Sequence, residues 1–256
     1  TRVATMPNTN PVIDTAALVK AMQKRAEEDA VVHIEIIGAV TKGQKGEEMA
    51  EVGDMTEAGA IAFSDDGHFT KSAKVLLNCY DYLRTFDKVI INHDEEPSLV
   101  EEGVMNESHR SAMLGMKGRP TVAEDIAVAR DIMLAEYADA KVHVAHISSA
   151  RAVDIVRQAK ARGVKVTAEA TPQHMTMTDD CVELFDSSTK INPPLREQKD
   201  VDAVLEGLKD GTIDCIVTDH SPHAQEEKDR EYIYAPSGFP GLETAVGVMM
   251  TDLVHT

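Results

Sequence analysis

Short apolar runs rich in β-branched residues alternate along this chain with longer amphipathic stretches. The runs predict seven strands, at 2–6, 32–37, 60–63, 88–91, 141–147, 164–168 and 214–218. Their nearly continuous apolar character indicates strands that are buried on both faces. The amphipathic stretches predict helices at 15–29, 47–58, 72–84, 121–138, 150–161, 200–208 and 241–253. Such alternation is typical of βα units around a parallel sheet.

The number of repeats favours a closed barrel over an open sheet. Seven βα repeats, with one further strand expected before residue 1, would complete a (β/α)8 TIM-type barrel, which takes about 250 residues. The alternative, an open doubly wound sheet, usually carries a glycine-rich phosphate loop, and neither GxGxxG after the first strand nor GxxxxGK[ST] occurs. We therefore expect residues 1–256 to form one partial catalytic barrel domain, cut from a longer polypeptide. The long loops at 95–120 and 225–234 are expected over one mouth of the barrel.

Composition narrows the range of partners. The 26 basic and 44 acidic residues give a net charge of -18, which opposes binding to nucleic acid or to an anionic membrane. No apolar run is long enough for a spanning helix, and the pattern of the first residues predicts no signal peptide. The three cysteines, Cys79, Cys181 and Cys215, are too scattered for a disulfide framework and are expected to be small core residues. These features predict a cytoplasmic protein.

Candidate chemistry gathers where predicted strands end. Asp66, His93, His146 and Asp219 each follow an apolar run, and the carboxyl ends of barrel strands form the active face. Two imidazoles and two carboxylates suit Zn²⁺, and a carboxylate can bridge two ions that activate water for hydrolysis. The pattern alone does not choose among an amide, an ester and a phosphoester.

Each of these residues also has a structural interpretation. A histidine at the end of an apolar strand is more often a hydrogen-bonded structural group, and Asp219 could cap the next turn. Asp65, next to Asp66, is expected to be a turn residue that bonds to its local backbone. His143 differs in strand parity from His146, so we expect it to face the helices. The joint occurrence of four donors at four strand ends favours a metal site.

Seven motifs in order resemble dihydroorotases of the bacterial class I type, within the amidohydrolase superfamily. They are MPNTNP at 6–11, AFSDDG at 62–67, HVAHIS at 143–148, AEATPQH at 168–174, NPPLR at 192–196, TDHSPH at 218–223 and GLET at 241–244. The resemblance implies a (β/α)8 barrel and the zinc-dependent, reversible conversion of L-dihydroorotate to N-carbamoyl-L-aspartate in pyrimidine synthesis. It also implies a cytoplasmic enzyme, expected to be a homodimer, that can associate with aspartate transcarbamoylase.

The resemblance assigns roles residue by residue. Asp66 matches the carboxylate between two metal sites, and His93 and His146 match ligands of the second zinc. Asp219 matches both a ligand of the first zinc and the base that moves the proton, so one or two ions are implied. The residues that match substrate-holding positions are Asn8, Asn192 and His223.

One family feature is missing from the printed sequence. The family carries an HxHxR motif at the end of the first barrel strand, and no HxH occurs here. We therefore expect that motif, and the small β-rich domain of the family, to lie outside the chain. Two alternatives stay open: another cyclic amidase of the hydantoinase or allantoinase type, and an inactive dihydroorotase-like subunit that scaffolds aspartate transcarbamoylase.

Overall fold

A computed structural model describes residues 1–255 and divides the chain into two compact units. Unit 1 comprises residues 1–94, 129–144 and 159–166, and unit 2 comprises residues 95–128, 145–158 and the chain from Thr167 onward. No helix within residues 1–255 has the length and the apolar character that crossing a membrane requires.

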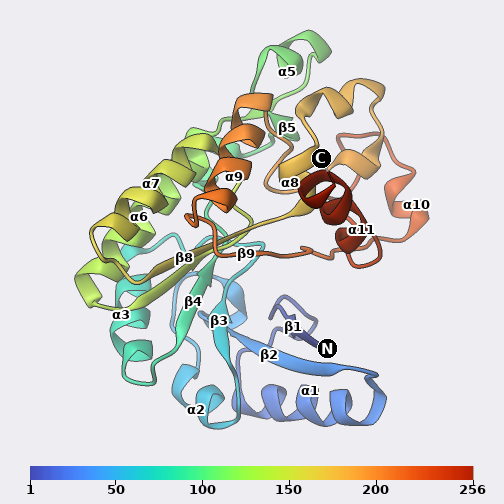
Figure 1. The fold of residues 1–256 in the computed structure, drawn as a ribbon. Helices are drawn as coiled ribbons and strands as arrows, with labels where there is room; N and C mark the ends of the chain where they lie inside the picture. Colours follow the sequence, from blue (N-terminus) through green and yellow to red (C-terminus); the bar gives the residue numbers. More distant parts are fainter. Residues whose placement is uncertain (256) are drawn as a thin grey trace. The chain divides into compact units, whose positions relative to one another are not determined.

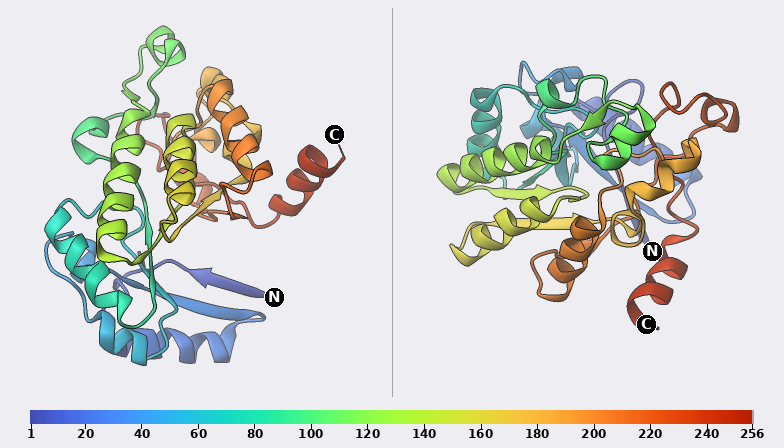
Figure 2. Two further views of the ribbon diagram at one scale, coloured as in Figure 1. Left: turned by 60° about the vertical axis from the view of Figure 1, so that its left-hand side comes forward. Right: turned by 90° about the horizontal axis from the view of Figure 1, so that it is seen from above.

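Unit 1 contains a parallel sheet with the order β1-β2-β3-β4-β7 (Figure 1). Its strands are β1 (Arg2–Thr5), β2 (His33–Ala39), β3 (Ala62–Ser64), β4 (Val89–Asn92) and β7 (Lys141–Val144). The helices between them are α1 (Ala16–Asp29), α2 (Val52–Glu57) and α3 (Ala73–Arg84). Helix α1 runs alongside β2 (Figure 2). Because all five strands are parallel, their carboxyl ends lie at one edge of this sheet.

Two helix starts of unit 1 follow from local hydrogen bonding. The side chains of Thr15 and Ser72 accept hydrogen bonds from the amides of Leu18 and Val75, so each is the N-cap of the helix that begins one residue later. The buried face of α3 carries Leu76, Tyr80 and Leu83, which are at most 1% exposed. The predicted helices at 15–29 and 72–84 are thus confirmed to within one residue.

Unit 2 is built from shorter elements. Strand β5 (Met105–Asn106) pairs with β6 (Gly118–Arg119), and β8 (Val166–Ala170), whose first residue belongs to unit 1, pairs in parallel with β9 (Cys215–Ile216). The helices are α4 (Pro97–Val100), α5 (His109–Leu114), α8 (Pro172–Thr176), α9 (Gln198–Lys209), α10 (Gln225–Lys228) and α11 (Ala245–Met249). Helices α6 (Val122–Ala138) and α7 (Ala150–Ala161) have residues in both units. The end of the described chain, from α11 onward, projects from the rest of unit 2 (Figure 2).

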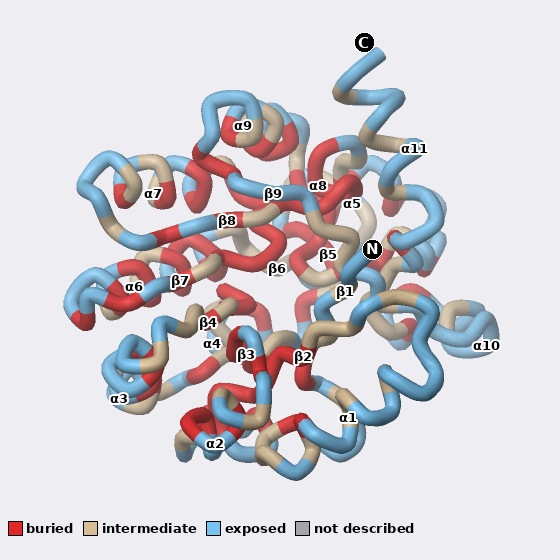
Figure 3. Tube along the Cα trace, turned by 60° about the horizontal axis from the view of Figure 1, so that its bottom comes forward, coloured by how far each residue is buried: buried red, intermediate tan, exposed pale blue. Residues whose placement is uncertain are grey.

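Several predicted bounds were wrong. The strand expected at 141–147 ends at Val144, and the strand expected at 214–218 is reduced to Cys215–Ile216. The helix expected at 47–58 covers only Val52–Glu57, and the one expected at 241–253 begins at Ala245. Burial on both faces holds for β3 but not for β1 or β9, which expose residues along their length (Figure 3).

The expectation that all three cysteines lie in the core was also wrong. Cys79 is buried in α3, where burial raises the pKa of its thiol to about 12. Cys181 and Cys215 are exposed. Cys215 lies on β9, both residues of which are exposed, so an apolar run here does not mark a buried strand.

Asp65 fastens the ends of two neighbouring strands. Its buried carboxylate accepts hydrogen bonds from the amides of Val40 and Thr41, each at 3.0 Å, and from the hydroxyls of Thr41 and Thr70. Burial raises the pKa of this carboxyl, while the hydrogen bonds lower it. Asp65 therefore has the structural role that was expected, but the expectation that its side chain bonds to the local backbone was wrong, because the carboxylate bonds to the end of β2 and to Thr70.

Replacing Asp65 by alanine should therefore destabilise the chain strongly. The substitution leaves buried amide and hydroxyl groups without an acceptor, and we expect a loss of about 3 kcal/mol in the free energy of unfolding. Asp54→Ala, at an exposed position of α2, is the matched control and should change this free energy by less than about 0.5 kcal/mol. Denaturant unfolding followed by circular dichroism measures both, and equal midpoints would contradict the role given to Asp65.

Candidate active site

Asp66 and His93 come together at the carboxyl edge of the sheet in unit 1. Asp66 follows β3 and His93 follows β4, and these strands are paired with Ser64 opposite Ile91. The Asp66 Oδ1 and His93 Nδ1 atoms are 3.8 Å apart, and the two side chains are 14% and 4% exposed. This separation is too long for a hydrogen bond and matches two ligands of one ion, which lie about 3–4 Å apart.

Neighbouring residues hold this pair in place. The amide of Asp66 donates to the Ser64 hydroxyl at 2.9 Å, and its carbonyl accepts from the Gln44 side chain at 3.2 Å. Asn92, directly before His93, donates to the hydroxyl of the fully buried Tyr80 at 2.8 Å. Both ligand candidates therefore extend from well-anchored backbone.

Asn8 lies beside the same turn. A Cβ atom built on Gly67, which has a φ of +79°, would be 3.7 Å from Asn8 Nδ2. Three of the predicted site residues, Asn8, Asp66 and His93, thus belong to one edge of unit 1.

His146 and Asp219 belong to unit 2 and share an unusual backbone conformation. Their φ angles are +32° and +45°, in the left-handed region that side chains other than glycine rarely adopt. Such strain costs of order 1 kcal/mol or more and is concentrated at functional sites, where the surroundings enforce it. Strand β7 ends at Val144, so strand alternation does not extend to His146. The prediction that compared the parity of His143 and His146 along one strand therefore does not apply. Within β7, His143 does alternate with the buried Val142 and Val144.

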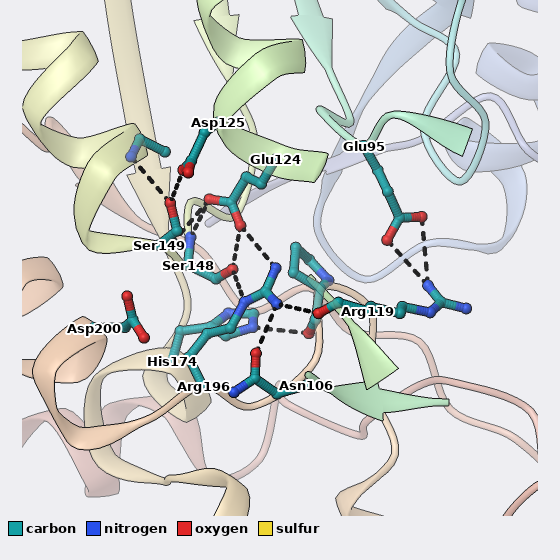
Figure 4. Close-up of polar contacts among 12 residues, drawn as sticks. Glu95, Asn106, Arg119, Glu124, Asp125, Ser148, Ser149, His174, Arg196 and Asp200 are labelled. Atoms are coloured by element: carbon teal, nitrogen blue, oxygen red, sulfur yellow. Dashed lines mark hydrogen bonds and ion pairs between the residues drawn. The ribbon is translucent and has the colours of Figure 1, made fainter. Parts of the chain in front are cut away.

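A buried ion pair fixes the segment that follows His146 (Figure 4). Glu124 accepts hydrogen bonds from the amides of Ser148 and Ser149 at 2.7 and 3.0 Å, and Arg196 Nη2 lies 3.2 Å from Glu124 Oε2. Both charged side chains are 4% exposed. Arg196 also donates to the Ser148 hydroxyl and to Asn106 Oδ1, each at 3.0 Å. No sequence pattern pointed to Glu124, and Arg196 stood out only as the last residue of a motif.

Asn192 lies in a second polar cluster of unit 2. Its Oδ1 accepts from Arg119 Nη1 at 2.7 Å, and its Nδ2 donates to Glu95 Oε2 at 3.2 Å. Arg119 also donates from Nη1 to Glu95 Oε1 at 3.1 Å. Neither Arg119 nor Glu95 was predicted as a site residue, because neither stands at the end of a long apolar run.

His223 lies on an exposed loop, which is held in place by hydrogen bonds from basic side chains. Its Nε2 donates to the Ser237 carbonyl at 3.0 Å, and its Nδ1 is 3.5 Å from Glu227 Oε2. Lys228 donates to the carbonyls of Pro236 and Gly238, and Lys190 donates to two carbonyls at 232–233. Burial lowers the pKa of Lys190 to about 8, with a smaller effect of the charges of Arg119 and Lys228.

His174 is a structural histidine. Its Nε2 lies 2.9 Å from the Pro193 carbonyl, which can only accept, so Nε2 carries the proton and Nδ1 accepts from the Thr171 hydroxyl at 2.8 Å. Burial lowers the pKa of His174 to about 4. The neutral imidazole of His174 thereby supports the segment next to Asn192.

Comparison with solved structures defines the fold. The chain matches an L-hydantoinase (dihydropyrimidinase) from Arthrobacter aurescens with a TM-score of 0.87 and 24% identity, over 100% of this chain and 58% of that one. A D-hydantoinase (dihydropyrimidinase) from Thermus sp. gives a TM-score of 0.79 at 22% identity, over 100% of this chain and 58% of that one. The fold is therefore α/β, of the TIM-type barrel kind, as the sequence predicted.

Sequence comparison then defines the family. The family model described as dihydro-orotase-like matches residues 1–152. The dihydroorotase of Pelotomaculum thermopropionicum is 53% identical over 254 residues, 99% of this chain and 59% of that protein. The dihydroorotase of Ruminiclostridium cellulolyticum is 50% identical over 254 residues, again 99% of this chain and 59% of that protein. The chain belongs to the dihydro-orotase-like family and spans about three fifths of the length of these relatives.

The environment of His174 predicts a pH dependence of stability. Because its folded pKa of about 4 lies below the unfolded value of 6.5, the unfolded chain takes up this proton first as the pH falls. The contribution to the free energy of unfolding is present above pH 6.5 and decreases by about 3 kcal/mol as the pH approaches 4. Denaturant unfolding from pH 7 to 4 should show this decrease in the wild type, and His174→Gln should lose that share of it. Identical pH slopes for the two proteins would show that His174 does not titrate as proposed.

Proposed function

We propose that the chain is part of the catalytic barrel of a zinc-dependent dihydroorotase, which hydrolyses L-dihydroorotate reversibly to N-carbamoyl-L-aspartate. The observation that carries the proposal is the approach of Asp66 Oδ1 to His93 Nδ1, 3.8 Å apart, at two positions to which the family resemblance assigns metal ligands. Relatives that are 50–53% identical across nearly the whole chain are named dihydroorotases. In this proposal residues 1–256 form one catalytic domain.

The donor chemistry fits a zinc ion. Asp66 supplies a carboxylate oxygen and His93 an imidazole nitrogen, both of which are common zinc ligands, and both side chains are largely withdrawn from water. His146 and Asp219 complete the proposed ligand set, and one or two ions are compatible with four such residues. Zinc bound there would polarise the ring amide and activate water for attack on its carbon.

The other residues of the proposed site handle the proton and the substrate. Asp219 receives the proton that the attacking water loses and delivers it to the leaving ring nitrogen. In the ring-closing direction the same carboxyl starts protonated. Asn8, Asn192 and His223 hold the substrate, whose carboxylate and carbonyl groups need hydrogen-bond donors.

The activity is tested on the metal-loaded enzyme that carries this chain. Formation of N-carbamoyl-L-aspartate from L-dihydroorotate, together with zinc analysis, supports the proposal. Turnover of hydantoin without turnover of dihydroorotate would replace it with a hydantoinase, and a stable protein without either activity would indicate a scaffold subunit. We also propose a cytoplasmic homodimer that can bind aspartate transcarbamoylase, which size-exclusion chromatography with and without that enzyme tests.

The proposed ligands differ from His143 in their expected response to substitution. His93→Ala and His146→Ala should each lower the zinc content and the rate of dihydroorotate hydrolysis, because each removes an imidazole ligand. His143→Ala is the matched control and should do neither. Metal analysis and steady-state kinetics on the three variants give the comparison, and zinc loss in His143→Ala alone would reverse the assignment of these residues.

Substitution of Asp219 should lower the rate of dihydroorotate turnover more than it lowers the metal content. Asparagine keeps an oxygen ligand but cannot carry the proton, so Asp219→Asn should retain most of the zinc and lose about 100- to 10,000-fold in kcat. His223→Asn should mainly raise KM, because it removes a proposed donor to the substrate. Near-normal kcat for Asp219→Asn at full zinc occupancy would assign the proton transfer to another group.

A further inference from the structure

Arg119, Glu95 and Asn192 form a closed ring of hydrogen bonds. Arg119 Nη1 donates to Asn192 Oδ1 at 2.7 Å and to Glu95 Oε1 at 3.1 Å, while Asn192 Nδ2 donates to Glu95 Oε2 at 3.2 Å. The Arg119 and Glu95 side chains are 19% and 16% exposed. The Arg119–Glu95 part of this ring is visible in Figure 4.

The charges in this ring decide which way the Asn192 amide points. A guanidinium group has only donors and a carboxylate has only acceptors. The amide oxygen must therefore face Arg119, and the amide nitrogen must face Glu95. A flipped amide would set NH2 against the guanidinium and oxygen against the carboxylate, and both contacts would be repulsive.

Arg119 is itself held firmly. Its Nε donates to the Gly103 carbonyl at 2.6 Å, and its own carbonyl accepts from the Glu107 amide at 3.0 Å and from Arg196 Nη1 at 3.2 Å. The close approach requires glycine at 103, since a Cβ atom there would lie 2.5 Å from Arg119 Cγ. Arg119, whose guanidinium orients Asn192, is thus anchored through both its side chain and its backbone.

We infer that Arg119 and Glu95 are positioning residues that hold the Asn192 amide so that it meets the substrate as an N–H donor. Because the ring turns the amide oxygen of Asn192 toward Arg119, the group that Asn192 presents to a substrate is its N–H, and the matching substrate atom is an acceptor such as a carbonyl or carboxylate oxygen. The ring therefore favours substrates with an oxygen acceptor at this point over those with a donor. The inference rests on the proposed role of Asn192 in binding dihydroorotate.

The first experiment compares Arg119→Met with Arg110→Met in the metal-loaded enzyme, using dihydroorotate as substrate. Arg119→Met frees the amide to rotate, so KM should rise about tenfold while kcat stays within about threefold and the metal content is unchanged. Arg110 pairs with Asp180 and Glu183 at the surface of the same segment, and its loss should change neither constant. A KM within about twofold of wild type for Arg119→Met would overturn the inference.

The second experiment separates the packing of the ring from the donor role. Asn192→Asp removes the N–H donor and sets a second carboxylate against Glu95, so it should lower Tm and raise KM. Adding Glu95→Gln supplies an amide that can donate to the carboxylate introduced at position 192. The double variant, Asn192→Asp with Glu95→Gln, should therefore recover Tm while KM stays raised. Recovery of both Tm and KM would overturn the donor role.

One further variant distinguishes the inference from the function on which it rests. If Asn192→Ala raises KM but Arg119→Met does not, the inference is wrong and the proposed substrate site stands. If Asn192→Ala leaves KM unchanged, Asn192 does not bind the substrate and both are wrong at this residue. An enzyme that is metal-loaded but inactive on dihydroorotate would overturn the proposed function itself.

Discussion

The buried pair of Glu124 and Arg196 is the interaction on which unit 2 depends most. Two opposite charges, each on a side chain that is 4% exposed, are stable away from water only when they are paired and hydrogen-bonded. Their other hydrogen bonds go to the adjacent Ser148 and Ser149, to Asn106 and to the carbonyl of Arg119, which lie in three separate stretches of the chain. The satisfaction of one ion pair thus fixes several stretches of backbone at once, including the stretch that follows His146.

In unit 1, two neighbouring aspartates have different partners. Asp65 is committed to the amides at the end of β2 and to two threonine hydroxyls. Asp66, one residue later, lies near the His93 ring instead. Asp65 thus holds the strand ends together, while Asp66 lies at the position where we propose a metal ligand.

Local signals predicted the regular part of the fold, and long-range contacts limited the rest. Thr15 and Ser72 mark helix starts through bonds to residues three positions away, so the sequence shows them directly. The pairing of Glu124 with Arg196 joins residues 72 positions apart and leaves no periodic pattern. The early end of β7 was also not predicted, since an apolar run does not show the left-handed turn at His146. The strand-end rule identified Asp66 and His93 as neighbours, but it could not identify Arg119 or Glu95.

The two polar clusters of unit 2 are connected through one residue. Arg196 donates to the main-chain carbonyl of Arg119, and the side chain of Arg119 donates to Asn192, four residues before Arg196. The orientation of the Asn192 amide therefore depends on a guanidinium whose backbone the buried ion pair helps to hold. A change at Glu124 would reach the proposed substrate contact through Arg196 and Arg119, without any direct contact between Glu124 and the substrate. Stability and the substrate selection proposed for Asn192 would consequently share one physical basis, the pairing of buried donors with buried acceptors.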